Sequence, residues 1–507
     1  MNSTEQKLHG IGSGENDKDV TQTCQCCLPL RYVIGIFIML GFTNVYAMRV
    51  NLSVALAVMV GNQTLMKGGM EIEEPAEFSW GTKTQGFILS AFYFGYIVMH
   101  LPGGYLARKH GGATLLGLSV GATGFLTLFT PLAAKTHVGV FIALRIAVGF
   151  AEGPVYPAGH AFWSKWAPPL ERSKLATLNV AGGILGIIMS MFLSGYIAFH
   201  FGWSWIFYVF GNSGLIWSIL CLCLVSNSPS QQRWISREEA EYIKVSLAGD
   251  LQSQDVPIPW KAIFTSLPFW AIIVTHSTHS FGYYMLISEL PLFYTQRLHL
   301  DLKQTWTASS LPYVVTLVML ILGGQIADYL RKHHLATGTV RKIFNTIGFL
   351  SEAISFLVLG YFSNATTVAV LITLGVGLGG LARSGFYVNH LDIAPPLASV
   401  LLGITNTAAS SAGILAPIVT GLIVQHHVSL VFKIVHLISR RWGFECSFCF
   451  SIFISKFTSL EWRIVFFIIA AMNVLGAIFF VIFGSGEKQS WAINEGYNEL
   501  PKEDPDE

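Results

Sequence analysis

The sequence predicts an all-α membrane protein with twelve transmembrane helices in two pseudo-symmetric six-helix halves. Of its 507 residues, 52% are hydrophobic and only 12% are charged, whereas soluble domains carry about 25% charged residues. Apolar stretches of about 20 residues or more recur along the chain, and each is long enough to cross a hydrocarbon core of about 30 Å. Matching short motifs in the two halves of the chain indicate an internal repeat.

The predicted spans are mostly joined by short loops. They cover residues 32–60, 85–107, 112–133, 138–163, 175–199, 203–225, 268–294, 308–329, 343–361, 366–388, 398–425 and 463–484. The longest polar connection separates six spans from six. We expect a cytosolic tail (1–30), an N-terminal half (31–225), a cytosolic loop (226–265), a C-terminal half (266–484) and a second cytosolic tail (485–507). The first 30 residues lack the apolar run of a signal peptide.

Loop charges predict the orientation of the chain in the bilayer. Lys and Arg are enriched in short loops on the cytoplasmic side of membrane proteins, and the loops after Arg108 and Arg331 are both basic. The first loop on the opposite side contains Asn62, followed by Gln63 and Thr64. This triplet is an acceptor for N-linked glycosylation, so we expect a glycoprotein that carries its glycan on Asn62.

The repeat suggests how the halves are arranged. The second span ends in Gly104-Tyr-Leu-Ala-Arg108, and the eighth, at the matching place, ends in Gly324-Gln-Ile-Ala-Asp328. Such a six-plus-six repeat is typical of the major facilitator superfamily, in which the substrate lies near the bilayer midplane between two rocking halves. The sequence therefore predicts the major facilitator superfamily fold.

Residues 428–457 interrupt the symmetry between the halves. Trp203 closely follows Gly195, whereas Trp462 follows Gly421, its counterpart, only after a much longer stretch. The two apolar runs within 428–457 are each too short to span a bilayer. We hypothesise that this insertion in the loop between helices 11 and 12 is a retained intron or a gene-model error; the alternative is a genuine extracellular hairpin. Sequencing the transcript across residues 425–459 distinguishes the two.

Two arginines inside predicted spans indicate an anion-binding cavity. Arg49 and Arg145 lie within long apolar segments, where a charged side chain costs at least about 2.5–3.5 kcal/mol. The guanidinium offers a planar fork of donors suited to a carboxylate or a phosphate. A structural ion pair is the alternative explanation, but the nearby carboxylate of Glu152 can neutralise only one of the two arginines.

Glu152 and His160 are the candidate proton-coupling residues. Glu152 follows Arg145 by about two helical turns and so shares its helix face. Burial favours the protonated form of a carboxylate and a nearby arginine favours the charged form; Glu152 is therefore either a proton carrier or a permanent bridge to Arg145 or Arg49. The imidazole of His160 suits a pH-sensitive gate, although a solvated or structurally hydrogen-bonded histidine fits the same position.

Further polar residues in the spans are candidate substrate ligands. These are Tyr46, Tyr284, Ser384, Asn389 and His390. Hydrogen bonds between helices explain such residues equally well. The chain has no phosphate-binding GxxxxGK[ST] loop, so no ATP-driven pump is indicated, and it has neither an HExxH nor a cysteine–histidine metal pattern. No basic block is long enough to suggest nucleic-acid binding. We expect no enzyme activity, no cofactor, no metal site and no nucleic-acid partner.

Several long motifs carry a family resemblance. They are NVYAMRVNLSVALAVMV, GYIVMHLPGGYLARKHGG, WSKWAPPLERSKLATL and GFYVNHLDIAPPLASVLLGITNT. The chain resembles solute carrier family 17, which includes sialin, the vesicular glutamate transporters and the sodium–phosphate cotransporters. The likeness extends over residues 30–495 except for 428–457.

The resemblance implies a role for several residues already considered. Arg49 and Arg145 match the substrate-anion arginines of the family, and Glu152 matches its proton-coupling glutamate. His160 matches a functional histidine, and Tyr284 and His390 match pocket residues.

The departures from the family pattern bear on the subfamily. Val148 stands where sialin has a second glutamate. Leu89 and His279 stand where the vesicular glutamate transporters have a histidine and an arginine, which disfavours glutamate as the substrate.

We therefore expect a secondary active anion transporter, a sialin-like symporter that couples acidic sugars or other organic anions to H⁺ by alternating access. A sodium-dependent inorganic phosphate cotransporter, with Na⁺ as coupling ion, is the alternative. A second alternative is a non-transporting membrane receptor or sensor. We expect a monomer in the plasma membrane or in an endolysosomal or vesicular membrane.

Overall fold

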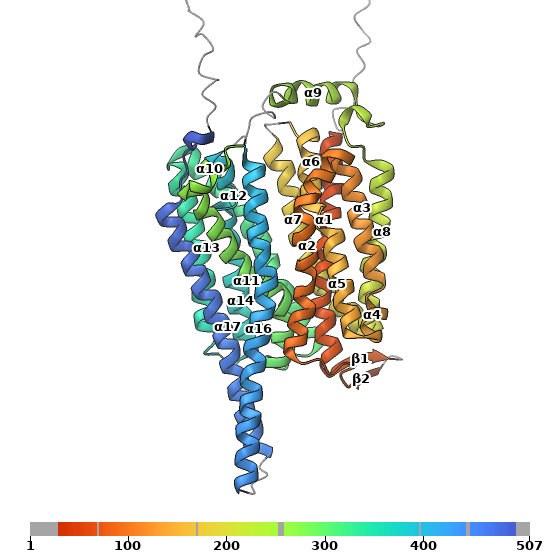
Figure 1. Cartoon of the computed structure of the whole chain (residues 1–507), viewed down its shortest axis with the longest axis vertical. Coiled ribbons are helices and arrows are strands. Elements are labelled where there is room, and N and C mark those ends of the chain that lie inside the picture. Colours follow the sequence, from red (N-terminus) through yellow and green to blue (C-terminus); the bar gives the residue numbers. More distant parts are fainter. Residues whose placement is uncertain are drawn as a thin grey trace, which may run out of the picture.

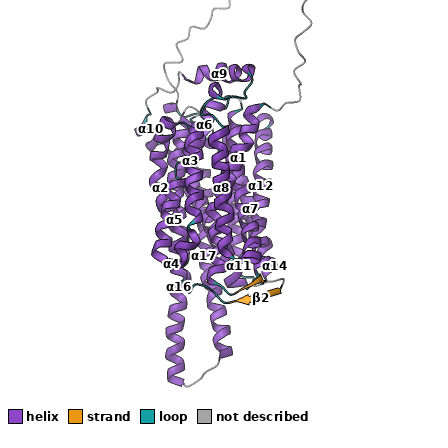
Figure 2. Ribbon diagram, turned by 90° about the vertical axis from the view of Figure 1, so that its right-hand side faces the viewer, coloured by secondary structure: helices purple, strands orange, loops and turns teal. Residues whose placement is uncertain are grey.

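A computed structural model of the chain describes residues 29–67, 70–168, 171–251, 258–362, 364–394, 397–442 and 447–492. Long helices run roughly parallel and form two bundles, one from each half of the chain (Figure 1). A short hairpin of β1 (Gln63–Lys67) and β2 (Met70–Glu74) lies at one end of the molecule, and helix α9 (Arg237–Leu251) lies at the other (Figure 2).

The N-terminal bundle follows the predicted order of spans. Its helices are α1 (Leu30–Val60), α2 (Thr82–His110), α3 (Gly112–Leu128), α4 (Thr130–Thr136), α5 (Val138–Glu152), α6 (Val155–Trp166), α7 (Arg172–Phe201) and α8 (Trp203–Leu224), followed by η1 (Pro229–Gln231). The proline at position 102 lies where α2 bends, because its ring displaces the preceding turn. α3 and α4 form a bent pair at an angle of 41°.

The C-terminal bundle contains the remaining helices. They are α10 (Trp260–Thr265), α11 (Leu267–Leu298), α12 (Leu302–His333), α13 (Thr337–Leu359), α14 (Ala365–Gly379), η3 (Gly380–Ser384), α15 (Asn389–Ile393), α16 (Ala398–Trp442) and α17 (Ser447–Phe483), followed by η5 (Ser490–Ala492). The predicted span 366–388 lies within Ala365–Ile393, which is long and apolar enough to cross a membrane. Its helix is interrupted, because α14 ends at Gly379 in a glycine-rich stretch and the 3-10 helix η3 follows.

The described helices have the length and hydropathy of a multi-pass membrane protein. Nine helical segments of the described chain are long and apolar enough to cross a bilayer, and the two bent pairs, within α2 and between α3 and α4, raise this to eleven. Helix α11 supplies a further long segment of 32 residues. Its hydropathy is lowered by buried polar residues such as His276, His279 and Glu289. Polar residues on the inner face of a span are typical of a substrate pathway.

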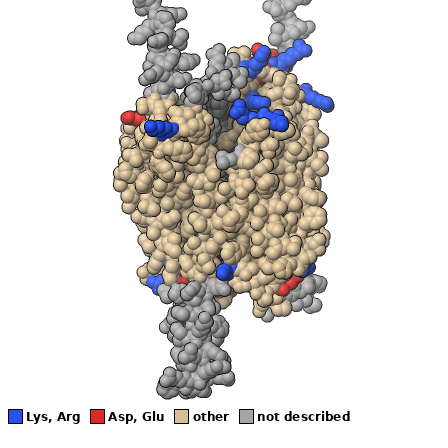
Figure 3. Space-filling model, in the orientation of Figure 1, with Lys and Arg blue, Asp and Glu red and all other residues tan. Residues whose placement is uncertain are grey.

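Basic side chains gather at the end of the molecule where α9 lies (Figure 3). Arg108 and Lys109 end α2, and Arg331 and Lys332 end α12. The β1–β2 hairpin lies at the opposite end (Figure 1). By the positive-inside rule the α9 end is cytoplasmic and the hairpin end is the outer side.

The two bundles meet closely on the outer side. Ser90 of α2 donates a 3.0 Å hydrogen bond to the carbonyl oxygen of Ile414 in α16. A Cβ atom on Gly86 would lie only 2.6 Å from the carbonyl oxygen of Pro417, so the two backbones nearly touch there. Gly195 of α7 packs equally closely against the Trp306 ring of α12. These contacts close the outer end of the path between the halves.

The cytoplasmic ends of the bundles are further apart. Figure 3 shows a hollow between the halves on the α9 side. The cross-bundle hydrogen bond between His100 and Asn406 on this side is long, at 3.4 Å. Tight packing on the outer side and a hollow on the cytoplasmic side make this an inward-facing arrangement.

The insertion at residues 428–457 lengthens two helices. Its described residues form the end of α16 and the start of α17, which continue past the β1–β2 hairpin as a pair (Figures 1 and 2). Both helical extensions lie on the outer side, where the sequence places the loop. The retained-intron hypothesis stays a prediction for the transcript.

Glycines set the crossing of α2 and α5. A Cβ atom on Gly149 would overlap the carbonyl oxygen of Phe92, and one on Gly95 would overlap that of Ile146. Only glycine permits such close approach of the two backbones. The crossing places Phe92 of α2 beside Arg145 of α5, which is one turn before Gly149.

We predict that Gly149→Val destabilises the protein, because a backbone carbonyl cannot move aside as a side chain can. The expected loss is about 1–3 kcal/mol, as for other overpacked cores. Thermal unfolding of the purified protein in detergent measures it. Gly104→Ala on α2 is the matched control, since a Cβ atom there meets nothing within 4 Å. Equal melting temperatures for Gly149→Val and wild type would contradict the proposed crossing.

Candidate anion-binding site

A buried ion pair joins α1 to the end of α5. The Nε of Arg49 donates a 2.7 Å hydrogen bond to Oε1 of Glu152, and its Nη2 donates to the same oxygen. Glu152 is fully buried and Arg49 is only 6% exposed. Glu152 is the last residue of α5, because Gly153 and Pro154 separate α5 from α6. Of the partners that the sequence left open for Glu152, the structure selects Arg49.

Aromatic rings surround the guanidinium of Arg49. Its Cζ atom lies 4.7 Å from the ring centroid of Tyr46, 4.8 Å from that of Phe92 and 4.8 Å from that of Tyr96. Each ring face attracts a cation, by about 0.5–2 kcal/mol depending on desolvation. These contacts partly offset the cost of burying Arg49 and fix the direction of its fork.

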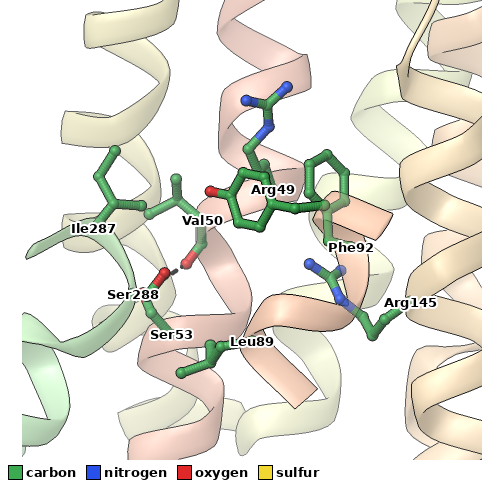
Figure 4. A pocket seen from close by; sticks show the side chains of 9 residues that line it. Arg49, Val50, Ser53, Leu89, Phe92, Arg145, Ile287 and Ser288 are labelled. Atoms are coloured by element: carbon green, nitrogen blue, oxygen red, sulfur yellow. Dashed lines mark hydrogen bonds between the residues drawn. The ribbon is translucent and has the colours of Figure 1, made fainter. Parts of the chain in front are cut away.

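Arg145 is buried without a carboxylate partner among the described residues. It is 2% exposed, and its Nε and Nη1 atoms have no hydrogen-bond partner in the described part of the chain. Its Cζ atom lies 5.7 Å from the Phe92 ring, which Arg49 also contacts (Figure 4). Burying an unpaired charge is costly. Arg145 is therefore the residue best placed to bind an anion.

A small cavity, here called the outer cavity, lies between the two arginines and α11. It is lined by Arg49, Val50, Ser53, Leu89, Phe92, Tyr93, Arg145, Ile287 and Ser288 (Figure 4). Its free volume is about 10 Å³, which is room for about one water molecule. An organic anion therefore requires the surrounding helices to move apart before it can reach both arginines.

A second cavity, here called the inner cavity, lies on the cytoplasmic side of Arg49. It is lined by Tyr46, Tyr156, Val180, His276, His279, Ser280, Tyr283, Tyr284, Arg383, Phe386, Tyr387 and Asn406. Its free volume is about 50 Å³. The hydroxyls of Tyr46 and Tyr156 are hydrogen bonded to each other at 2.8 Å. The predicted ligands Tyr46 and Tyr284 thus lie together in one polar cavity between the halves.

Arg383 also lines the inner cavity, although it was not among the predicted site residues. Arg383 lies in η3, and its Cζ atom is 4.9 Å from the Tyr283 ring centroid. The position falls within the predicted span 366–388. The criterion that singled out Arg49 and Arg145, an arginine inside an apolar span, therefore applies to it as well.

Two predicted ligands lie in a structural network at the cytoplasmic end instead. Arg341 donates to the carbonyl oxygen of Ser384 at 2.8 Å and to Asp392 at 2.7 Å. Asn389 donates to Asp392 and, at 2.8 Å, to the carbonyl oxygen of Ser485. Neither Ser384 nor Asn389 lines one of the two cavities.

The two predicted histidines lie near the inner cavity but not on its wall. The Nε2 of His390 is 2.9 Å from the hydroxyl of Thr405, which is itself 3.3 Å from Nδ1 of His276 on the cavity wall. His160 is half-buried in α6, one turn beyond Tyr156. His390 can thus orient a cavity residue through Thr405.

The predicted glycosylation residue lies at the outer end. Asn62 is exposed between α1 and β1, and its side-chain oxygen accepts a 3.1 Å hydrogen bond from the backbone N–H of Ala76. Its glycosylation stays a prediction.

Comparison with known proteins identifies the family. Residues 33–417 match the family model described as the Major Facilitator Superfamily. Human sialin is 40% identical to this chain over 486 residues, which is 92% of each protein. Vesicular glutamate transporter 3 of Danio rerio is 38% identical over 479 residues, 93% of this chain and 76% of that protein. The chain belongs to solute carrier family 17 of the Major Facilitator Superfamily. The prediction of the family is therefore confirmed, as is the prediction that the protein is a membrane transporter rather than an enzyme.

Solved structures confirm the predicted fold class of this transporter. A bacterial homologue of the human lysosomal transporter Spinster, in an inward-facing and occupied conformation, has a TM-score of 0.68 at 14% identity, covering 90% of this chain and 97% of that one. A D-xylose–proton symporter has a TM-score of 0.62 at 16% identity, covering 90% and 98%. At these identities the likeness concerns the fold alone.

We predict that Arg145→Lys lowers anion uptake at least about tenfold while the protein still reaches the membrane, because lysine keeps the charge but loses the planar fork. Uptake into proteoliposomes with surface expression measured in parallel tests this. Arg463→Lys in α17 is the matched control, because Arg463 lies over the ring of Tyr361 and lines neither cavity. Normal uptake by Arg145→Lys would remove Arg145 from the binding site.

Proposed function

We propose that this transporter is a secondary active symporter that moves organic anions, of the acidic-sugar class, together with protons by alternating access. The observation that carries the proposal is the buried Arg145, which forms no ion pair in the described part of the chain because Glu152 is held by Arg49. An anionic substrate supplies the missing negative charge. The relatives named sialin and vesicular glutamate transporter agree with an anion as the substrate.

The Arg49–Glu152 pair offers a route for coupling to protons. In the inward-facing arrangement Arg49 is held by Glu152. A proton bound to Glu152 neutralises the carboxylate and frees the guanidinium of Arg49 for the substrate. Loss of that proton restores the ion pair, and the anion is then released. Proton and anion thus occupy the site together, which is the requirement for symport.

The same arginines suit phosphate, because a guanidinium binds phosphate and carboxylate oxygens in the same bidentate way. A sodium-driven phosphate carrier is therefore the second candidate. Proteoliposomes loaded under either a proton or a sodium gradient separate the two functions, with sialic acid, glucuronate, aspartate, glutamate and phosphate as the panel. Proton-driven accumulation of an organic acid supports the proposal. Sodium-driven uptake of phosphate alone would overturn it, and binding without transport would indicate a receptor.

We predict that Glu152→Gln weakens pH-driven accumulation more strongly than exchange. Glutamine cannot carry the proton, yet it leaves Arg49 free to bind the anion on both sides of the membrane. Net uptake under a proton gradient and counterflow without a gradient are measured on the same proteoliposomes. Glu289→Gln is the matched control, since Glu289 is also a buried acid, whereas among the described residues it forms no ion pair with an arginine. An equal loss of both activities in Glu152→Gln would show that the ion pair is only structural.

A further inference from the structure

The inner cavity carries a positive charge of its own. Arg383 comes from the C-terminal half, where η3 interrupts the helical span after α14. Among the residues that line the inner cavity, Arg383 alone is charged at neutral pH regardless of its surroundings, and none is acidic. A cavity lined by one cation and several hydroxyls favours a polar anion.

Nearby carboxylates do not neutralise Arg383 in an ion pair. Glu352 of α13 is near enough to interact electrostatically with Arg383, but it accepts a 3.0 Å hydrogen bond from Asn473, and no ion pair joins it to Arg383 among the described residues. Asp392 is paired with Arg341. The guanidinium of Arg383 instead lies over the ring of Tyr283, which also lines the inner cavity.

His279 provides an independent sign of a ligand in this cavity. It is only 7% exposed, yet neither ring nitrogen has a hydrogen-bond partner among the described residues. Its ring packs near those of Tyr283 and Phe386, 6.2 Å and 5.4 Å away between centroids. Buried polar atoms are usually paired. An imidazole left unpaired on a cavity wall that also holds Arg383 is suited to donate to an anionic group there.

The two cavities are separated by one layer of aromatic rings. Tyr93 lines the outer cavity and Tyr284 lines the inner cavity, and their ring centroids are 4.9 Å apart. Tyr46 also lines the inner cavity and contacts the guanidinium of Arg49. A single organic molecule of moderate length can therefore reach both cationic sites once these tyrosines move apart.

We propose that Arg383 and His279 form a second anion-binding subsite, and that the preferred substrate is a hydroxylated dicarboxylate. One carboxylate is bound by Arg49 and Arg145 in the N-terminal half, and the other is bound by Arg383 in the C-terminal half. The tyrosine hydroxyls between them face the hydroxyl groups of the substrate. This inference rests on the proposed function and specifies its substrate class. A substrate bound in this way links the two halves. Closure of the halves around it then depends on the second carboxylate.

Equilibrium binding to the purified full-length protein in detergent tests the subsite without any gradient. The probes are two matched pairs, glucarate with glucuronate and succinate with butyrate, which differ in the second carboxylate. We expect wild type to bind the dicarboxylate of at least one pair about tenfold more tightly or better. Arg383→Gln should abolish this preference while leaving the affinity for the monocarboxylate unchanged. Arg463→Gln, the control outside the cavities, should keep the preference.

Other outcomes overturn the inference. One is that wild type binds the dicarboxylate and the monocarboxylate of each pair with equal affinity. Another is that Arg383→Gln weakens the binding of both acids equally. The third is that the preference for the dicarboxylate survives in Arg383→Gln. Arg383→Lys and the melting temperature without ligand show whether a loss reflects misfolding, because lysine keeps the charge and should retain part of the preference.

Uptake assays distinguish failure of the subsite from failure of the proposed function. Selective binding of the dicarboxylate through Arg383, without proton-driven uptake, would leave the subsite standing and overturn proton-coupled symport. Proton-driven uptake of the dicarboxylate and the monocarboxylate at equal rates, unaffected by Arg383→Gln, would support proton-coupled symport and overturn the subsite.

Discussion

The ion pair between Arg49 and Glu152 is the interaction on which the rest of the site depends. Removing one partner of a buried ion pair costs about 3–5 kcal/mol, because the other charge is left uncompensated. In this transporter Glu152 pairs with Arg49. From the sequence spacing alone, Arg145 was an equally possible partner. Arg145 therefore stays buried and without a carboxylate partner in the described chain, beside the Phe92 ring that it shares with Arg49. The close α2–α5 crossing at Gly149 holds this arrangement in place.

The two halves contribute different parts of one pathway. The N-terminal half supplies the arginine pair and the carboxylate that exchange a proton and an anion in the proposed cycle. The C-terminal half supplies histidines, tyrosines and Arg383 around the inner cavity. Close contacts such as Gly86 with Pro417 seal the outer side in the inward-facing arrangement. In alternating access, the contacts on the outer side break and new contacts form on the cytoplasmic side when the halves rock about the substrate.

The sequence alone was sufficient to locate the apolar helices and to predict that Arg49 and Arg145 lie buried within them. Both predictions rest on local properties, namely the length of an apolar stretch and the presence of a charge inside it. The partner of Glu152 was not predictable. Its spacing from Arg145 is a property of one helix, whereas its contact with Arg49 depends on how α1 packs beside α5. For Ser384 and Asn389 the sequence left open whether they bind substrate or make structural hydrogen bonds. Their partners Arg341 and Ser485 could not be predicted, because they lie far away in sequence. Arg383 is a different case, because the criterion used for Arg49 and Arg145 was enough to find it.

In the proposed cycle an anion and a proton together replace the Arg49–Glu152 ion pair. Calorimetric titration of the purified protein with its transported anion, in buffers of different ionisation enthalpy, measures the protons taken up on binding. We expect uptake of about one proton per anion bound, as linkage requires when one carboxylate becomes neutral. Glu152→Gln should bind the anion with no proton uptake. Anion binding to wild type with no change in bound protons would contradict the claim, because the ion pair would then persist alongside the substrate.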